Sequence, residues 1–229
     1  MIHPLGYAEG LYGQNLNSCF GPQGCCLYSH QFYKHSSCNK FSLGYTFQSI
    51  RGPLPIESSI SWLRRRYLKP SDSFVDSLHS LFNHTSHLTV ITHDLPEESN
   101  FVSLSKHMDR FNSLIPSVSY SLSANTKSML IHGLDNARRV LYASGAKKTF
   151  VSGPVRETGW HALGTCRMGL DSNQAVVNQF CRSHDHPNLF IVDGSVFPSS
   201  SGVNPCNTIQ SLSLYVGDYI LRHKSFYLS

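Results

Sequence analysis

Charged side chains and long apolar runs are both scarce in this sequence. Of its 229 residues, 14% are Asp, Glu, Lys or Arg, and the formal net charge is +5. The basic residues are scattered apart from the RRRYLK run at 64–69, which we interpret as a solvated face rather than a nucleic-acid site. No apolar stretch approaches the roughly 20 residues that a membrane helix requires, and the first ten residues lack the basic-then-apolar order of a signal peptide. We therefore expect no nucleic-acid partner and no membrane span, with the cytoplasm as the default compartment.

The cysteines do not fit the even set expected of a secreted disulfide framework, because there are seven of them. They are Cys19, Cys25, Cys26, Cys38, Cys166, Cys181 and Cys206. The early group is interleaved with His30 and His35, and thiolate and imidazole ligands suit zinc. Their spacing matches no zinc module, so we predict free thiols and no metal site, with a zinc-binding module as the weaker alternative. No base adjoins the three late cysteines, which we interpret as buried small residues rather than nucleophiles.

Apolar spacing and glycine content divide the chain into three segments. Residues 1–40 show neither helical nor strand periodicity, and we expect an irregular or poorly ordered segment there. Residues 41–152 alternate between helix-like and strand-like patterns, which predicts a substrate-binding-like sheet with flanking helices. Residues 153–229 contain glycine-rich stretches between short apolar runs. We take these boundaries as the expected domain organisation.

Several patterns in the middle segment predict particular elements. Helix-like spacing covers residues 73–82, whereas residues 87–96 and 117–123 alternate as strands do. A longer helix is expected over residues 125–144, and Gly145 is well placed to end it. Its apolar face consists of Leu130, Leu134, Ala137 and Leu141.

The last segment predicts a strand followed by a helix. Residues 188–195 form an apolar run typical of a strand buried on both faces, with Asp193 and Gly194 at its carboxyl end. Residues 203–222 have helical spacing, with Pro205 in the first turn. The predicted inward face consists of Ile209, Leu212, Val216 and Ile220. A strand, a glycine-containing loop and a helix N-terminus form a geometry that holds an anionic cofactor group.

Three motifs follow one another in this segment. HALGTCRMG occupies residues 161–169, VVNQFCRSHDHPNLFIVDGSVFP occupies 176–198, and GVNPCNTIQSLSL occupies 202–214. In this order and spacing they resemble the carboxyl-terminal region of the glucose-methanol-choline (GMC) oxidoreductases, flavoenzymes that oxidise alcohols using FAD. The resemblance is strong over about residues 157–221 and weaker upstream, through DLP and MLIHG. It implies an α+β or α/β fold, in which a substrate-domain sheet with helices joins the carboxyl-terminal strand and helix of the FAD domain.

The resemblance assigns His161 and Asn204 to catalysis. Alcohol oxidation removes the hydroxyl proton and transfers a hydride from the same carbon to the flavin, so a base is needed beside the ring. Histidine suits this task at neutral pH because its reference pKa is about 6.5. The family motif places the base at His161, and at Asn204 a group that hydrogen-bonds the substrate oxygen. Two alternatives stay open: His161 as a structural or surface residue, and Asn204 as a helix N-cap.

The resemblance also indicates which residues face the cofactor. They are Asp193, Gly194, Asn204, Pro205 and Thr208. A helix beginning near Pro205 would offer unpaired N–H groups and the positive end of its dipole to a reduced flavin ring. The carboxylate of Asp193 could accept hydrogen bonds from sugar-chain hydroxyls, with an ordinary turn as the alternative. Of the other motif residues, Arg167 is expected in an internal ion pair and Met168 in packing.

One motif of the family is absent, because no G-x-G-x-x-G turn occurs anywhere in the sequence. Members of the family bind the ADP half of FAD through this turn, near the amino terminus. We therefore expect part of a flavin-dependent dehydrogenase or oxidase acting on an alcohol or sugar-like substrate, inactive without a complementary FAD-binding chain. The alternative is a catalytically silent relative that binds no FAD and acts, if at all, as an interaction protein.

Overall fold

The chain forms two compact units, each assembled from separated stretches of sequence. The computed structural model describes residues 1–21, 25–34, 40–51, 55–64, 73–155 and 160–224. The sheet unit comprises Leu5–Thr92 and Ser128–Arg156, and the motif unit comprises Met1–Pro4, His93–Lys127 and Glu157–Ser229. The units are interleaved along the chain, whereas the segments expected from the sequence are consecutive.

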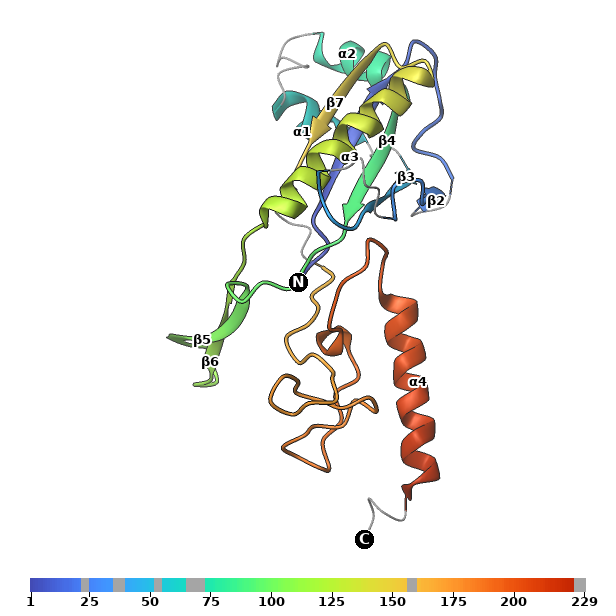
Figure 1. Cartoon of the computed structure of the whole chain (residues 1–229). Coiled ribbons are helices and arrows are strands. Elements are labelled where there is room, and N and C mark those ends of the chain that lie inside the picture. Colours follow the sequence, from blue (N-terminus) through green and yellow to red (C-terminus); the bar gives the residue numbers. More distant parts are fainter. Residues whose placement is uncertain (22–24, 35–39, 52–54, 65–72, 156–159, 225–229) are drawn as a thin grey trace. The chain divides into compact units, whose positions relative to one another are not determined.

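A five-stranded antiparallel sheet forms the centre of the sheet unit, in the order β2-β3-β4-β1-β7 (Figure 1). Its strands are β1 (Leu5–Leu11), β2 (Cys25–Ser29), β3 (Tyr45–Ile50), β4 (Thr85–Thr92) and β7 (Lys148–Ser152). β1 lies inside the sheet, where Ala8 pairs with Leu88 of β4 and with Val151 of β7. The strand expected over residues 87–96 is confirmed as β4, although it ends before His93.

The expectation of an irregular first segment is wrong for β1 and β2. In β1, two glycines and a glutamate interrupt the apolar pattern by which a strand is recognised. Gly6 is needed for close packing, because a Cβ there would lie 2.8 Å from the Ser152 carbonyl oxygen and 3.1 Å from Leu134 Cδ2. A Cβ on Gly10 would also be tight, at 3.1 Å from Ala146 Cβ. The close approach of β7 and of Leu134 in α3 therefore favours glycine at a position where it hides the strand signal.

Helix α3 (Ala124–Ala143) packs on one face of the sheet and confirms the helix expected over residues 125–144. Its predicted apolar face is confirmed by the buried side chains of Leu130, Leu134, Ala137 and Leu141. They pack in one core with Ala8 of β1 and Val90 of β4. The helix ends before Gly145, which has a φ of 101°.

The opposite face of the sheet carries a buried polar group. Glu9 of β1 is 1% exposed, and its Oε1 accepts a hydrogen bond of 3.0 Å from Nε1 of Trp62. Nε2 of His87 in β4 lies 3.6 Å from the same oxygen. Trp62 belongs to α1 (Pro55–Arg64), which the sequence pattern did not predict, whereas α2 (Phe74–Leu81) confirms the helix expected over residues 73–82. Because successive strand residues point to opposite faces, Glu9 and Ala8 place Trp62 and α3 on opposite sides of the sheet.

The motif unit contains a hairpin, a helix and a set of tight turns. The hairpin pairs β5 (Phe101–Met108) with β6 (Leu114–Ser119), which overlaps the strand expected over residues 117–123. Helix α4 (Cys206–Arg222) confirms the helix expected over residues 203–222. The core of the motif unit consists of Val177, Cys181, Val196 and Val216, and Leu212 and Ile220 of α4 also pack against it. Within the described part of the chain, no helix has the length and apolar content needed to cross a membrane.

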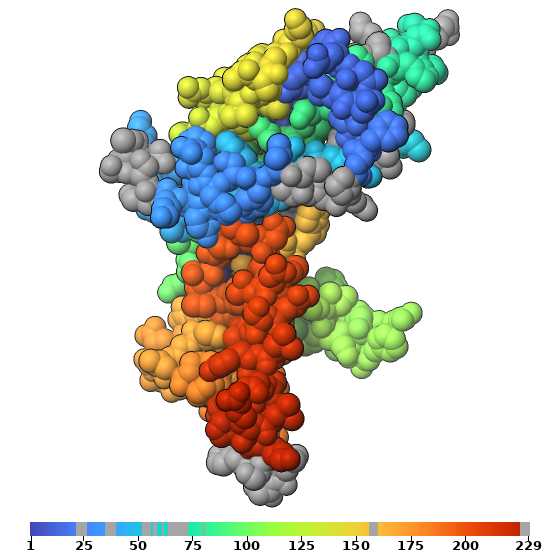
Figure 2. All heavy atoms as spheres, turned by 90° about the vertical axis from the view of Figure 1, so that its right-hand side faces the viewer, coloured from blue at the N-terminus to red at the C-terminus, as the bar shows by residue number. Residues whose placement is uncertain are grey.

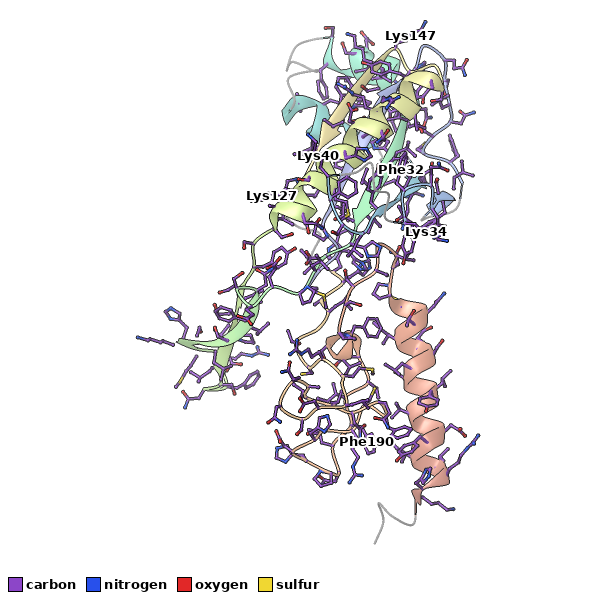
Figure 3. The ribbon with its side chains drawn as sticks, in the orientation of Figure 1. Phe32, Lys34, Lys40, Lys127, Lys147 and Phe190 are labelled. Atoms are coloured by element: carbon purple, nitrogen blue, oxygen red, sulfur yellow. The ribbon has the colours of Figure 1, made fainter. Side chains whose placement is uncertain are left out.

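The expectation of a buried strand over residues 188–195 is wrong. Phe190 makes only an isolated bridge to Arg182, and the run ends in the short 3-10 helix η1 (Gly194–Val196). Phe190, labelled in Figure 3, packs with Ile191 and Val192 against the core that α4 covers. The described residues provide no named strand beside this run, so its apolar content reflects burial against a helix and turns rather than strand pairing.

Candidate active site

His161, the expected base, is hydrogen-bonded to a second histidine. Its Nδ1 lies 2.9 Å from Nδ1 of His3, and the two rings meet edge to face with their centroids 4.9 Å apart. The side chain of His3 is fully buried, whereas His161 is partly exposed. His161 is therefore the member of the pair that a reactant can reach.

The backbone explains why two histidines so distant in sequence meet. The backbone nitrogen of Met1 donates to the carbonyl of Leu163 at 2.9 Å, and the nitrogen of Leu163 donates to the carbonyl of Met1 at 3.0 Å. This double exchange is the bonding of directly opposed residues in an antiparallel pair. Two residues further along in the same register, His3 lies opposite His161, on the same face of the pair.

Burial makes the histidine cluster, defined as His3, His93 and His161, neutral at physiological pH. The pKa of His3 is lowered to about 4, mainly by burial and also by the neighbouring His161 and His93, while the backbone of Ser201 acts in the opposite direction. Burial also lowers the pKa of His161, and it lowers that of His93 against an opposing effect of the Ser200 backbone. A neutral imidazole keeps one unprotonated nitrogen, so the cluster can accept a proton.

Asp94 ties together the stretches that carry the histidine cluster. Its carboxylate accepts hydrogen bonds from the backbone nitrogen of Ile2 at 3.0 Å and from the hydroxyl of Tyr120 at 2.9 Å. The Oγ of Ser200 accepts from the Asp94 nitrogen and donates to the Asp94 carbonyl, both at 2.7 Å. Burial raises the pKa of this carboxyl group, and the bonds from Ile2 and Tyr120 oppose that rise. These contacts hold the residues next to His3 and His93 in place.

The motif that begins at His161 runs alongside η1. Its backbone nitrogens at Gly164, Cys166 and Met168 donate to the carbonyls of Gly194, Ser195 and Val196, at 3.2, 2.8 and 2.8 Å. A Cβ on Gly194 would lie 2.9 Å from the Ala162 carbonyl oxygen and 2.8 Å from Leu163 Cδ2. The glycine is therefore required by the close approach of the segment that follows His161.

Asp193 caps η1, since its Oδ1 accepts a hydrogen bond of 2.8 Å from the nitrogen of Ser195. The side chain of Asp193 is exposed, as are Asn204 and Thr208, whereas Gly194 and Pro205 are buried. The turn expected as the alternative for residues 193–194 thus has a structural function of its own. That function leaves the carboxylate accessible.

The start of α4 places Pro205, rather than Asn204, at the N-cap position, and no side chain caps the helix. The first helical bond joins the nitrogen of Ile209 to the carbonyl of Pro205 at 3.0 Å. The N–H groups of the preceding turn have no acceptor inside the helix and lie at the positive end of its dipole. Asn204 follows Ser201, whose backbone acts on His3, by three residues. A shared substrate between His161 and Asn204 stays a prediction.

Three motif residues differ in part from expectation. Arg167 is exposed and its Nε donates to the carbonyl of Gln174 at 2.5 Å, so the prediction of an internal ion pair for Arg167 is wrong. Met168 packs against the core as expected. Among the late cysteines Cys181 is buried as expected, whereas Cys206, the first residue of α4, is exposed and Cys166 is intermediate.

The early cysteine and histidine group falls largely outside the described residues. His35 and Cys38 lie in the undescribed stretch 35–39. Among the described residues, no group of three or more His, Cys, Asp or Glu side chains is arranged to hold a metal ion.

His3, His93 and Asp94 were missed as site residues. His3 stands in a stretch without periodicity, and its partner His161 is 158 positions away. The pairing of Met1 with Leu163 that brings them together leaves no mark on local sequence. The DLP stretch that includes Asp94, through its weak resemblance to the family, was the only sequence signal for this part of the site.

Comparisons with known proteins bear on both the fold and the motifs. A family model described as GMC oxidoreductase matches residues 96–213. The 2-methyl-1,2-propanediol dehydrogenase of Mycolicibacterium austroafricanum is 33% identical over 211 residues, which cover 90% of this chain and 38% of that protein. The 6'''-hydroxyparomomycin C oxidase of Streptomyces lividus is 32% identical over 155 residues, covering 65% of this chain and 28% of that protein. The chain therefore spans well under half the length of these relatives.

Solved structures show the same architecture. Pyridoxine 4-oxidase from Mesorbium loti matches with a TM-score of 0.61 and 18% sequence identity, over 96% of this chain and 42% of that chain. Since this match omits only 4% of the chain, it includes most of the first forty residues, which the motifs of the sequence did not reach.

Proposed function

Because the chain belongs to the GMC oxidoreductase family, we propose that it forms the catalytic part of an FAD-dependent oxidoreductase acting on a CH–OH group. The observation that carries the proposal is the neutral, partly exposed His161 at the head of its motif, held by the buried His3. A base with a lowered pKa stays unprotonated at neutral pH, which is the form that can remove a hydroxyl proton.

The proposed reaction separates a proton from a hydride. The Nε2 of His161 takes the hydroxyl proton, and the side-chain amide of Asn204 donates a hydrogen bond to the oxygen as negative charge develops on it. FAD, when bound, supplies the acceptor for the hydride that leaves the carbinol carbon. The alcohol is thereby oxidised by two electrons to the carbonyl compound, and His161 is left as an imidazolium.

The residues at the start of α4 fit the ring end of a flavin. Pro205 and Thr208 frame the turn whose N–H groups lack helical acceptors, and these donors suit an anionic reduced ring. The exposed carboxylate of Asp193 is suited to accept hydrogen bonds from the sugar-chain hydroxyls, and Gly194 holds it beside the His161 motif. The pyrophosphate cradle must come from a complementary FAD-binding segment or chain, because the sequence has no G-x-G-x-x-G turn.

The relatives guide the choice of substrate. One is named for the diol 2-methyl-1,2-propanediol and another for 6'''-hydroxyparomomycin C, and both names describe a dehydrogenase or oxidase. We therefore propose an alcohol or sugar-like substrate for this chain. A diol such as 2-methyl-1,2-propanediol is a suitable first compound to test.

The test joins residues 1–229 to a G-x-G-x-x-G-containing half taken from a family member. The fused protein should purify with flavin absorbance, which an alcohol should bleach in the absence of oxygen. His161→Ala should lower turnover by about 10²–10⁴-fold, the usual range for loss of a general base, while the flavin stays bound. Near wild-type turnover in this variant would assign the base to another group.

A second candidate is a catalytically silent relative that acts as an interaction protein. The missing dinucleotide motif favours it. A fused protein that binds flavin normally but is bleached by no alcohol would support this second function over the first.

A further inference from the structure

His3 comes from a stretch without a catalytic motif, yet it is fixed against the proposed base. The Nδ1–Nδ1 distance of 2.9 Å to His161 is that of a hydrogen bond. In such a bond one nitrogen carries the proton and the other presents its lone pair. The protonation pattern of one ring therefore determines that of the other.

The two possible arrangements have opposite chemical consequences. If His3 donates, neutral His161 carries its proton on Nε2 and presents an N–H to the reactant. If His161 donates, its proton is on Nδ1 and its Nε2 presents a lone pair. Only the second arrangement lets the ring remove a hydroxyl proton through Nε2.

We propose that His3 accepts the Nδ1–H of His161 and so holds Nε2 of His161 as the proton-accepting nitrogen. This inference rests on the proposed role of His161 as the base. His3 acts through His161 and is a positioning residue.

The surroundings of His3 support this direction of the bond. The backbone of Ser201 favours a proton on the His3 ring, as a carbonyl acceptor does, and Nδ1 of His3 is already occupied by His161. That leaves Nε2 as the nitrogen of His3 that can carry its proton, and Nε2 is buried without a direct hydrogen-bond partner in the described part of the chain.

The charge around His3 also supports His3 as the acceptor in the bond with His161. The ring faces His161 and His93, and both add to the effect of burial, so that the pKa of His3 is about 4. His3 therefore remains a neutral acceptor after His161 has taken a proton. The bond from the resulting imidazolium to His3 is then charge-assisted and stronger than before.

The decisive experiment needs neither FAD nor turnover. The chain of residues 1–229 is labelled with ¹⁵N-histidine, and long-range ¹H–¹⁵N spectra report which nitrogen of each ring carries the proton. We expect the His161 proton on Nδ1 at neutral pH. A proton on Nε2 of His161 would overturn the proposal without any variant.

Two substitutions at position 3 separate positioning from packing. His3→Leu should leave His161 as a mixture of both tautomers, because the acceptor is lost. His3→Asn should keep the proton on Nδ1, because the amide oxygen can accept a hydrogen bond from nearly the same place. His184→Leu is the matched control, since His184 bonds the Gly169 carbonyl at 3.1 Å in the same unit. A folded His3→Leu variant with an unchanged His161 tautomer would contradict the proposal, and if that variant fails to fold, the wild-type spectrum still decides.

Activity of the fused protein then distinguishes the two proposals. His3→Leu should lower kcat by about 10- to 100-fold with little change in KM, and His3→Asn should recover most of it. A wild-type spectrum with the expected tautomer but no alcohol oxidation would reject the proposed function and keep the positioning role. Full kcat in His3→Leu would reject the positioning role and keep the proposed function.

Discussion

Gly194 and Ala162 approach so closely that a side-chain carbon does not fit between them, since a Cβ on Gly194 would lie 2.9 Å from the Ala162 carbonyl oxygen. The obstructing atom is backbone, so it cannot rotate away. We expect Gly194→Ala to lower the free energy of unfolding by about 1–3 kcal/mol through overpacking. It should also shift the NMR signals of His161, because the displaced segment starts there.

Gly217→Ala is the matched control for that substitution. Gly217 lies within α4, and a Cβ there meets no atom within 4 Å. Alanine should stabilise the helix by about 0.5–1 kcal/mol. Equal effects of the two substitutions in urea titrations would show that the approach of Gly194 to Ala162 carries no cost.

The buried bond between Trp62 and Glu9 should contribute measurably to the stability of the sheet unit. Trp62→Phe keeps the aromatic packing but removes the donor that Glu9 Oε1 accepts from at 3.0 Å. We expect a loss of about 1–3 kcal/mol in urea unfolding, because the variant removes a hydrogen bond to a buried carboxyl oxygen. Trp160→Phe is the control, because Trp160 is 74% exposed and its replacement should change stability by less than about 0.5 kcal/mol. Similar losses in both variants would contradict this account.

Acid should destabilise the chain through His3. Its pKa is about 4 in the folded chain against an ordinary 6.5, so above pH 6.5 the ring is neutral in both states and its contribution is complete. Between pH 6.5 and 4 the unfolded chain takes up a proton that the folded chain excludes, which lowers stability by up to about 1.4 kcal/mol per pH unit. His93 and His161 act in the same direction, and Asp94, whose pKa is raised, opposes them.

Urea midpoints measured across this window should therefore fall with pH, and they should fall less in His3→Asn than in the wild type. The asparagine does not titrate, so the difference between the two curves isolates the contribution of position 3. Parallel curves would mean that His3 is protonated equally in the folded and unfolded chains.

The β5–β6 hairpin should drive self-association of the isolated chain. The hairpin is coloured light green in Figure 2. Many of its apolar side chains are exposed. Those exposed by more than 40% are Phe101, Val102, Leu104, Met108, Phe111, Leu114, Ile115 and Val118. Exposed apolar patches and unpaired strand edges favour association. We expect the mass measured by sedimentation to rise with protein concentration.

A charge pair on one face of the hairpin tests this expectation. Val102 and Val118 are directly paired, so V102K together with V118E places opposite charges side by side and should keep the mass near that of a monomer. The control is S103K with S117E, the next pair along, whose side chains lie on the other face. A wild-type chain that stays monomeric at all concentrations would contradict the prediction outright.

The elements predicted from the sequence share one property, which is that local spacing alone determines them. In α3 and α4 apolar residues recur every three or four positions and so form one face of each helix, and the structure buries those faces. β1 and the run 188–195 fail for opposite reasons. In β1 the close approach of β7 and α3 leaves no room for a side chain at Gly6, where a strand pattern needs an apolar one. In residues 188–195 apolar side chains pack on a helix without strand pairing.

The residues of the candidate site likewise divide into those that local sequence identifies and those that it does not. His161, Asp193 and Asn204 lie inside contiguous motifs, so sequence alone singled them out, and their roles stay predictions. His3 and His93 belong to the site only because backbone pairing and the Asp94 contacts bring distant stretches together. No local pattern records such contacts.

The pairing of Met1 with Leu163 also determines when, during protein synthesis, the contact between His3 and His161 can form. His3 leaves the ribosome 158 residues before His161, and at about 5–20 residues per second that interval is on the order of ten seconds. Within that interval Asp94 emerges and can accept the hydrogen bond of the Ile2 nitrogen, and all five strands of the sheet emerge as well. The histidine pair can thus form only after every strand of the sheet is available, and a chain released between residues 152 and 161 would carry the whole sheet without His161.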